Sequence, residues 1–424
     1  MIKPADVRLA ASMRNSGMTR KNMIGLSICY LAVFTMGNGF LPLMPIYAQA
    51  LGGTREIAGF YLAFSFLCVS VGALLGGRLS DMTGHRRFLL AATGLVIVPT
   101  TWLVGRVGNV WQLGLATGGE WLFGGMSLGV VGAIVGKLAR ENERGRLFGI
   151  LGMTISLGAL LGGLTFGRMA DAWGYSTMFT AVALFMAIVP AAAILLVDGG
   201  TADPVKARTR LPGDGQWASG AFLLLLLAVI LAWAVAGAGN LGRSLSMNER
   251  AFSNAAISTT AAVGGIVSLP VPFILGWISD RVGRRSIIIA TFLAGLASLL
   301  LLMVSRSLWQ YWTVAALLSL QAVSMSIGPA FVADIVKKER VGTGISFFQS
   351  CTWIGTVVGY VYSGIAFQHF GIPAGLAVGT IFPLLGIIII FLIRPSSLSR
   401  GGTGRGPEAA GIGPLEGAPR PAKQ

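Results

Sequence analysis

One stretch of this chain reads Gly77-Arg78-Leu79-Ser80-Asp81-Met82-Thr83-Gly84-His85-Arg86-Arg87, and it recurs as Gly276-Trp277-Ile278-Ser279-Asp280-Arg281-Val282-Gly283-Arg284-Arg285. The two copies align without a gap, and they share Gly, an aliphatic residue, Ser, Asp, Gly and Arg at matching positions. A second echo pairs Glu143-Arg144 with Glu339-Arg340. The chain is therefore expected to consist of two related halves.

The sequence around these stretches is that of a membrane protein. Hydrophobic residues make up 54% and charged residues 11%, whereas soluble domains carry about 25% charged residues. A helix needs about 20 mostly apolar residues to cross a bilayer. Gly371 and Pro373 should split the long last run, because these residues interrupt helices. The apolar runs then predict twelve transmembrane helices: 22–54, 57–77, 88–105, 107–136, 147–167, 172–197, 215–242, 251–279, 286–305, 307–333 and the two parts of 341–393.

The basic residues fix the predicted orientation. With both termini in the cytoplasm, 26 of the 32 Lys and Arg residues fall in the inner segments and 6 in the outer connections. Such a bias is typical of cytoplasmic loops. The net charge of +16 therefore indicates membrane topology, and no basic helix face suggests binding to nucleic acid.

The polar and charged segments between the apolar runs predict the organisation of the chain. It should be an all-α integral protein of the cytoplasmic membrane. Two six-helix bundles are expected at 22–197 and 217–394. A polar linker rich in Gly and Pro joins them at 198–216. Residues 1–21 should form a cytoplasmic segment, and 395–424 a disordered cytoplasmic tail that has almost no large apolar residues.

The repeated stretch resembles the loop motif G-x-L-(S/A)-D-x-x-G-x-R of the major facilitator superfamily. The resemblance covers about residues 20–395, and the second copy departs from the motif in having Ile278 where Leu is usual. It implies a transporter that works by alternating access between two repeated halves. In that family the motif forms a cytoplasmic latch that holds the outward-facing state.

The resemblance assigns roles to ten residues of the expected latch. Gly77 and Gly276 would permit tight packing at the helix ends, and Gly84 and Gly283 would permit the turn. The carboxylates and their candidate arginine partners are Asp81, Asp280, Arg86, Arg144, Arg285 and Arg340.

Glu120 is the ionisable residue that stands out within a span. It lies near the middle of the run 107–136, and ionisable residues at such depth are usually functional. Its carboxyl could bind and release a proton during transport, or it could hold a cationic substrate. Many relatives carry an Arg in the equivalent slot, so an arginine-based mechanism does not transfer to this chain. A structural hydrogen bond to a neighbouring helix is the alternative.

The nearest branch by resemblance is that of the twelve-helix drug/proton antiporters. The segment from Ser156 to Gly163 is similar to their motif G-P-x-x-G-G, with Ala159 in place of Pro. Asn38 stands where many of them have an acid. Further residues that could line a cavity are Trp121, Asn240, Gln321, Gln349, Trp353 and Arg243, the last at the outer end of its helix, where it could receive an anionic group.

These patterns favour a secondary transporter over an enzyme. No phosphate-binding loop, metal-ligand spacing or cofactor motif occurs in the sequence. We expect a monomer in the lipid bilayer that exports amphipathic or drug-like small molecules, driven by protons. The alternatives are an importer or facilitator of a metabolite such as a sugar or organic anion, and a membrane sensor that transports nothing.

Overall fold

The computed structural model describes residues 19–138, 144–194, 196, 220–336 and 340–393. The described residues of the first half form seven helices: α2 (Arg20–Phe40), α3 (Met44–Ala50), α4 (Arg55–Thr83), α5 (Arg86–Val104), α6 (Val110–Leu138), α7 (Arg144–Met186) and α8 (Ile188–Ile194). Those of the second half form nine: α9 (Gly220–Glu249), α10 (Asn254–Ser268), α11 (Val271–Val282), α12 (Arg284–Val304), α13 (Leu308–Ala322), α14 (Ser324–Ile335), α15 (Val341–Phe370), α16 (Ile372–Gly379) and α17 (Ile381–Leu392). The expected linker, the cytoplasmic tail and most of the N-terminal segment lie outside these residues.

Within the described residues, nine helical segments are long and apolar enough to cross a membrane, and α10 with α11 makes a tenth. One of them, α7, would be about 65 Å long at 1.5 Å per residue, about twice the bilayer core. It is interrupted at Gly174, where φ is 76°, so it contains two of the expected spans. The 30-residue α15 is long enough for a further span but is not among the apolar segments, so the count of twelve stays a prediction. The orientation of the termini stays a prediction.

The predicted break near Gly371 is confirmed, because α15 ends at Phe370 and Gly371 has a positive φ of 79°. Two other expected helices are not continuous. The run 251–279 divides into α10 and α11, which are bent by 43°. Pro270 and Pro272 explain this bend, since proline removes backbone donors from a helix. The run 307–333 divides at Val323 into α13 and α14.

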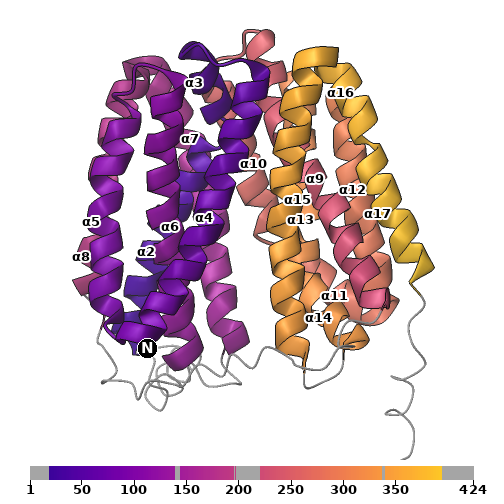
Figure 1. Cartoon of the computed structure of the whole chain (residues 1–424), viewed down its shortest axis with the longest axis horizontal. Coiled ribbons are helices and arrows are strands. Elements are labelled where there is room, and N and C mark those ends of the chain that lie inside the picture. The colour runs from indigo at the N-terminus through magenta and orange to yellow at the C-terminus, as the bar shows by residue number, and fades with distance from the viewer. Residues whose placement is uncertain (1–18, 139–143, 195, 197–219, 337–339, 394–424) are drawn as a thin grey trace, which may run out of the picture.

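The two halves lie side by side, and α2 begins and α17 ends at the same end of the molecule (Figure 1). We call this the inner end and the opposite one the outer end, following the predicted orientation. Small residues let the helices approach closely. A Cβ atom at Gly72 of α4, for example, would lie 2.0 Å from the Leu122 carbonyl oxygen of α6. Such backbone contact is the means by which helices pack in lipid.

The halves are joined at the outer end by polar contacts. Asp171 of α7 accepts hydrogen bonds from the backbone N–H groups of Asn254 and Ala255 at 3.1 and 2.8 Å. A carboxylate is favourable there, because these groups begin α10 and carry the positive end of its dipole. Arg55 forms an ion pair of 2.6 Å with Glu249 across the two halves. The structure therefore has its outer end closed, through contacts that we call the outer seal.

Candidate functional site

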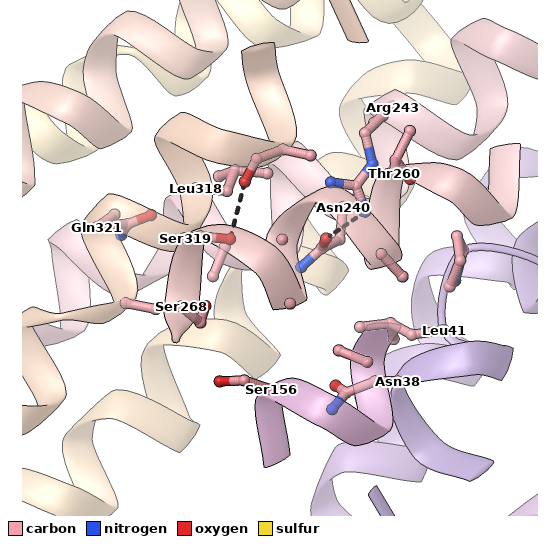
Figure 2. Close-up of a pocket in the computed structure, with 18 of the residues that line it drawn as sticks. Asn38, Leu41, Ser156, Asn240, Arg243, Thr260, Ser268, Leu318, Ser319 and Gln321 are labelled. Atoms are coloured by element: carbon pink, nitrogen blue, oxygen red, sulfur yellow. Dashed lines mark hydrogen bonds between the residues drawn. The ribbon is translucent and has the colours of Figure 1, made fainter. Parts of the chain in front are cut away.

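A cavity of about 240 Å³ lies between the two halves, and we call it the polar cavity because charged, amide and hydroxyl side chains are part of its largely apolar wall. Both halves contribute to it, and Figure 2 shows Asn38 and Ser156 across the space from Asn240 and Arg243. Its lining includes Asn38 of α2, Ser156 and Ala159 of α7, Trp233, Asn240 and Arg243 of α9, Thr260 of α10, and Ser319 and Gln321 of α13. A cavity at the interface of the repeats is where transporters of this architecture hold their substrates.

Arg243 is placed differently from the sequence prediction. The run 215–242 suggested that Arg243 ends its helix, but α9 continues to Glu249. The helix continues through the polar residues Arg243, Ser244 and Ser246. Their exposures are 5%, 0% and 6%, so they are surrounded by protein and not by lipid. An arginine that was expected near the outer surface thus lines the cavity. Its Nη2 donates to Asn240 Oδ1 at 3.0 Å.

A second, apolar cavity of about 100 Å³ adjoins the first, because Asn38 and Leu41 line both. Trp121 and Trp353 line it together with Phe66. The Phe66 ring centre lies 5.1 Å from that of Trp121 and 5.8 Å from that of Trp353. These three rings, which we call the aromatic cluster, come from both halves. The combined site offers polar groups at one end and aromatic faces at the other.

Glu120 is fully buried inside the first half. Thr101 of α5 donates to Glu120 Oε1 at 3.0 Å, whereas Oε2 has no hydrogen-bond partner among the described residues. The carboxyl lines neither of the two cavities. Met36 lies between this carboxyl and the apolar cavity, because Met36 lines that cavity and its sulfur lies 3.5 Å from the Thr101 hydroxyl oxygen. Glu120 is therefore connected to the apolar cavity through Thr101 and Met36.

The remaining predicted lining residues have mixed positions. Gln321 lines the polar cavity and donates to the Ala232 carbonyl oxygen at 2.6 Å. Gln349 is half-buried on α15 and lines neither of these cavities. Phe66 was missed, since it is one of several aromatic residues in an apolar run and nothing in the sequence sets it apart from the others. Asp171, which closes the outer end, was missed as well, although its place beside the Gly174 break is visible in the sequence.

The segment from Ser156 to Gly163 packs on two helices at once. A Cβ atom at Gly162 would lie 2.4 Å from the Thr35 carbonyl oxygen of α2, and one at Gly163 would lie 2.3 Å from the Ala262 nitrogen of α10. Gly162 thus packs against a helix of its own half, whereas Gly163 packs against a helix of the other half. Close packing accounts for these glycines without the Pro that the antiporter motif would place at Ala159.

The repeated loops lie at the inner end with their carboxylates exposed. Arg86 Nη2 lies 3.8 Å from Asp81 Oδ1 within one loop. Asp280 is exposed and is in none of the ion pairs between described residues. Arg285 donates to the Phe391 carbonyl oxygen of its own half. One guanidinium nitrogen of Arg340 is buried without a partner in the described residues, and nothing is described of the Arg144 side chain.

The four glycines of the repeated loops divide into two pairs. Gly84 and Gly283 have φ angles of 69° and 96°, which confirms the predicted turns. The expected tight packing at Gly77 and Gly276 is wrong in this conformation, because a Cβ atom at either would meet nothing within 4 Å. It is instead the backbone nitrogen of Gly77 that lies close to Gly129 of α6. With the outer end closed, the loops of the two halves are not pressed together at these positions.

An all-helical membrane protein with two repeated halves around a central cavity is a secondary transporter. Comparison with known proteins identifies the family. The profile of the Major Facilitator Superfamily matches residues 26–246 and 218–422. The chain belongs to this superfamily, and it is a multi-pass protein of the cytoplasmic membrane.

Relatives and solved structures agree with this assignment. The "Multidrug resistance protein MdtG" of Enterobacter lignolyticus is 26% identical over 404 residues, which are 89% of this chain and 93% of that protein. The solved peptide transporter POT, as an E310Q mutant with alafosfalin, has a TM-score of 0.73 at 14% identity and covers 92% of this chain and 98% of its own. An inward-facing, unoccupied bacterial homologue of the lysosomal transporter Spinster has a TM-score of 0.69 at 14% identity, covering 88% and 96%. At this identity the two structures show the fold.

Proposed function

We propose that this transporter exports amphipathic, drug-like compounds in exchange for protons. The observation that carries the proposal is the pair of adjoining cavities between the halves, one polar and one aromatic. Such a site suits a molecule with a polar group and an apolar body. The multidrug resistance proteins to which the chain is similar support export over uptake of a metabolite. The protein works as a monomer in the bilayer, since the halves of one chain enclose the cavity.

Glu120 is the proposed proton carrier. A carboxyl with one unsatisfied oxygen in the protein interior can be stabilised by taking up a proton, or by a partner that arrives in another conformation. Thr101 contacts both Glu120 and Met36, and Met36 lines the apolar cavity. A substrate in this cavity can therefore alter the protonation of Glu120 by moving these side chains.

Transport by the purified protein in proteoliposomes tests the proposal. An outwardly directed proton gradient reproduces the cellular one for molecules inserted inside-out, and an inwardly directed gradient does so for molecules inserted right side out, so both directions are applied. A fluorescent aromatic amphiphile should move against the protons in a gradient-dependent manner, and lumenal pH should change in step. The proposal would be wrong if the amphiphile moved no faster than in empty liposomes while a sugar moved with the gradient. The protein would then be a transporter of a metabolite.

The repeated loops are the proposed cytoplasmic latch of the outward-facing state. Asp81→Asn should shift the protein toward the conformation described here, in which the outer end is closed. A cysteine probe in the polar cavity, at Ser156, should then react faster with reagent from the inner side by about fivefold, which corresponds to losing about 1 kcal/mol of charged hydrogen bonding. Asp334→Asn is the control, because Asp334 pairs with Arg284 inside one half at 2.6 Å. Equal reactivity in the two variants would contradict the latch.

A further inference from the structure

Arg243 is a buried cation that no carboxylate of the described protein neutralises. Its exposure is 5%, and none of the ion pairs between described residues involves it. Its Nη2 is bonded to Asn240, whereas its Nε is buried without a partner among the described residues. A buried charge left in this state is costly, and within a membrane span such a residue is functional as a rule. The side chain is part of the cavity wall.

The surroundings of Arg243 are suited to an acceptor of hydrogen bonds. The Asn240 carbonyl oxygen accepts from Arg243, and the Asn240 amide group, which lies beside the Tyr360 hydroxyl, has two N–H donors. The amide of Asn38 belongs to the same cavity wall (Figure 2). The hydroxyl groups of Thr260 and Ser319 also lie on this wall, but they already donate to carbonyl oxygens of their own helices at 2.6 and 3.0 Å. A carboxylate only accepts hydrogen bonds, and a guanidinium binds it with two parallel donors.

The aromatic cluster lies next to this polar end. Tyr360 of α15 lies near Arg243, and its ring centre lies 5.2 Å from that of Phe66. The guanidinium and the aromatic faces are thus connected through one side chain. Asn38 and Leu41 mark the passage from the polar to the apolar cavity. A short molecule could reach both ends at once.

We propose that the substrates of this transporter are amphipathic anions, whose carboxylate or similar group binds Arg243 and Asn240 while their apolar body lies against the aromatic cluster. The inference rests on the proposed function, since it names the chemical class that the exporter takes. It makes Arg243 the residue that selects substrates by charge. Cationic and neutral amphiphiles of the same shape are discriminated against, because they leave the guanidinium unpaired.

Binding of three matched probes to the purified full-length protein tests this. The probes are 4-phenylbutyrate, its primary amide and 4-phenylbutylamine, which differ only in the head group, and their affinities are measured by calorimetry at neutral pH. The carboxylate should bind at least about tenfold more tightly than the amide, as expected for a hydrogen-bonded charge pair, and the amine should bind most weakly. Arg243→Gln should abolish this preference and leave amide binding unchanged, whereas Arg243→Lys should keep part of it. Arg306→Gln, which removes an exposed outer arginine, should match the wild type.

Two results would overturn the inference: equal affinity of the three probes for the wild type, or a preference for the carboxylate that survives Arg243→Gln. Absence of carboxylate binding to folded wild-type protein would overturn it as well. If Arg243→Gln unfolds, Arg243→Lys and the wild-type ranking decide the question. Failure of the proposed function has a different signature, since the probes would then bind in the expected order without any gradient-driven transport. Export of the amine without binding of the carboxylate would support the proposed export function and contradict the anionic class of substrate.

Discussion

Replacing Glu120 by Gln should abolish transport driven by a pH gradient while leaving exchange of substrate for substrate intact. Gln keeps the size and the acceptor oxygen that Thr101 contacts at 3.0 Å, but it binds no proton at neutral pH. Because Glu120 is fully buried and lines neither cavity, the substitution removes no substrate contact. Gradient-driven flux should fall by about 100-fold or more, toward the liposome leak, as expected when an essential proton carrier is lost.

The measurement uses proteoliposomes in which flux under a pH gradient is compared with exchange at equal pH. Glu56→Gln is the matched control, since Glu56 lies in the first turn of α4 at the outer end, and it should keep both activities. Gradient-driven flux of Glu120→Gln at the normal rate, with its normal pH dependence, would show that Glu120 carries no proton. If exchange were lost together with gradient-driven flux, Glu120 would have a structural role in the packing of the first half.

Replacing Gly167 by Ala should prevent the outer end from closing. A Cβ atom at Gly167 of α7 would lie 2.2 Å from the Asn254 carbonyl oxygen and 2.5 Å from the Ser258 Cβ of α10. No flexible side chain can relieve these contacts, because the nearest obstacle is backbone. Overpacking of this kind costs about 1–3 kcal/mol, which shifts the ratio of closed to open outer ends by about 5- to 150-fold. Transport in both modes should fall accordingly, since alternating access requires closure.

Labelling of Ser258→Cys from the outer side reports this change. Ser258 is fully buried in the closed seal, so an impermeant thiol reagent should react with it faster in the Gly167→Ala background. Gly114→Ala is the control, because a Cβ atom there would meet nothing within 4 Å. Asp171→Asn weakens the same seal without added volume and should act in the same direction. Unchanged labelling in both seal variants would mean that these contacts do not set the equilibrium.

Much of the candidate site was visible in the sequence. Asn38, Trp121, Asn240, Arg243, Gln321 and Trp353 were predicted from polarity or aromatic character within spans, and each lines one of the two cavities. Polar residues are favoured at such positions because a polar group in a membrane span needs a protein or solvent partner. Gln349 met the same criterion but faces neither of these cavities. Whether a particular polar side chain turns toward a cavity depends on the rotation of its helix, which packing sets.

Apolar length, charge bias and the paired loop motif are properties of the amino-acid chain, and they suffice to identify a multi-span transporter with two repeated halves. How those spans meet is a property of the folded protein. The tertiary structure extended α9 past Arg243 and buried that cation beside Asn240. It also separated Glu120 from the cavity and brought Asp171 to the start of α10. Such contacts join residues far apart in the chain, and their geometry follows from how closely the glycines let the helices approach.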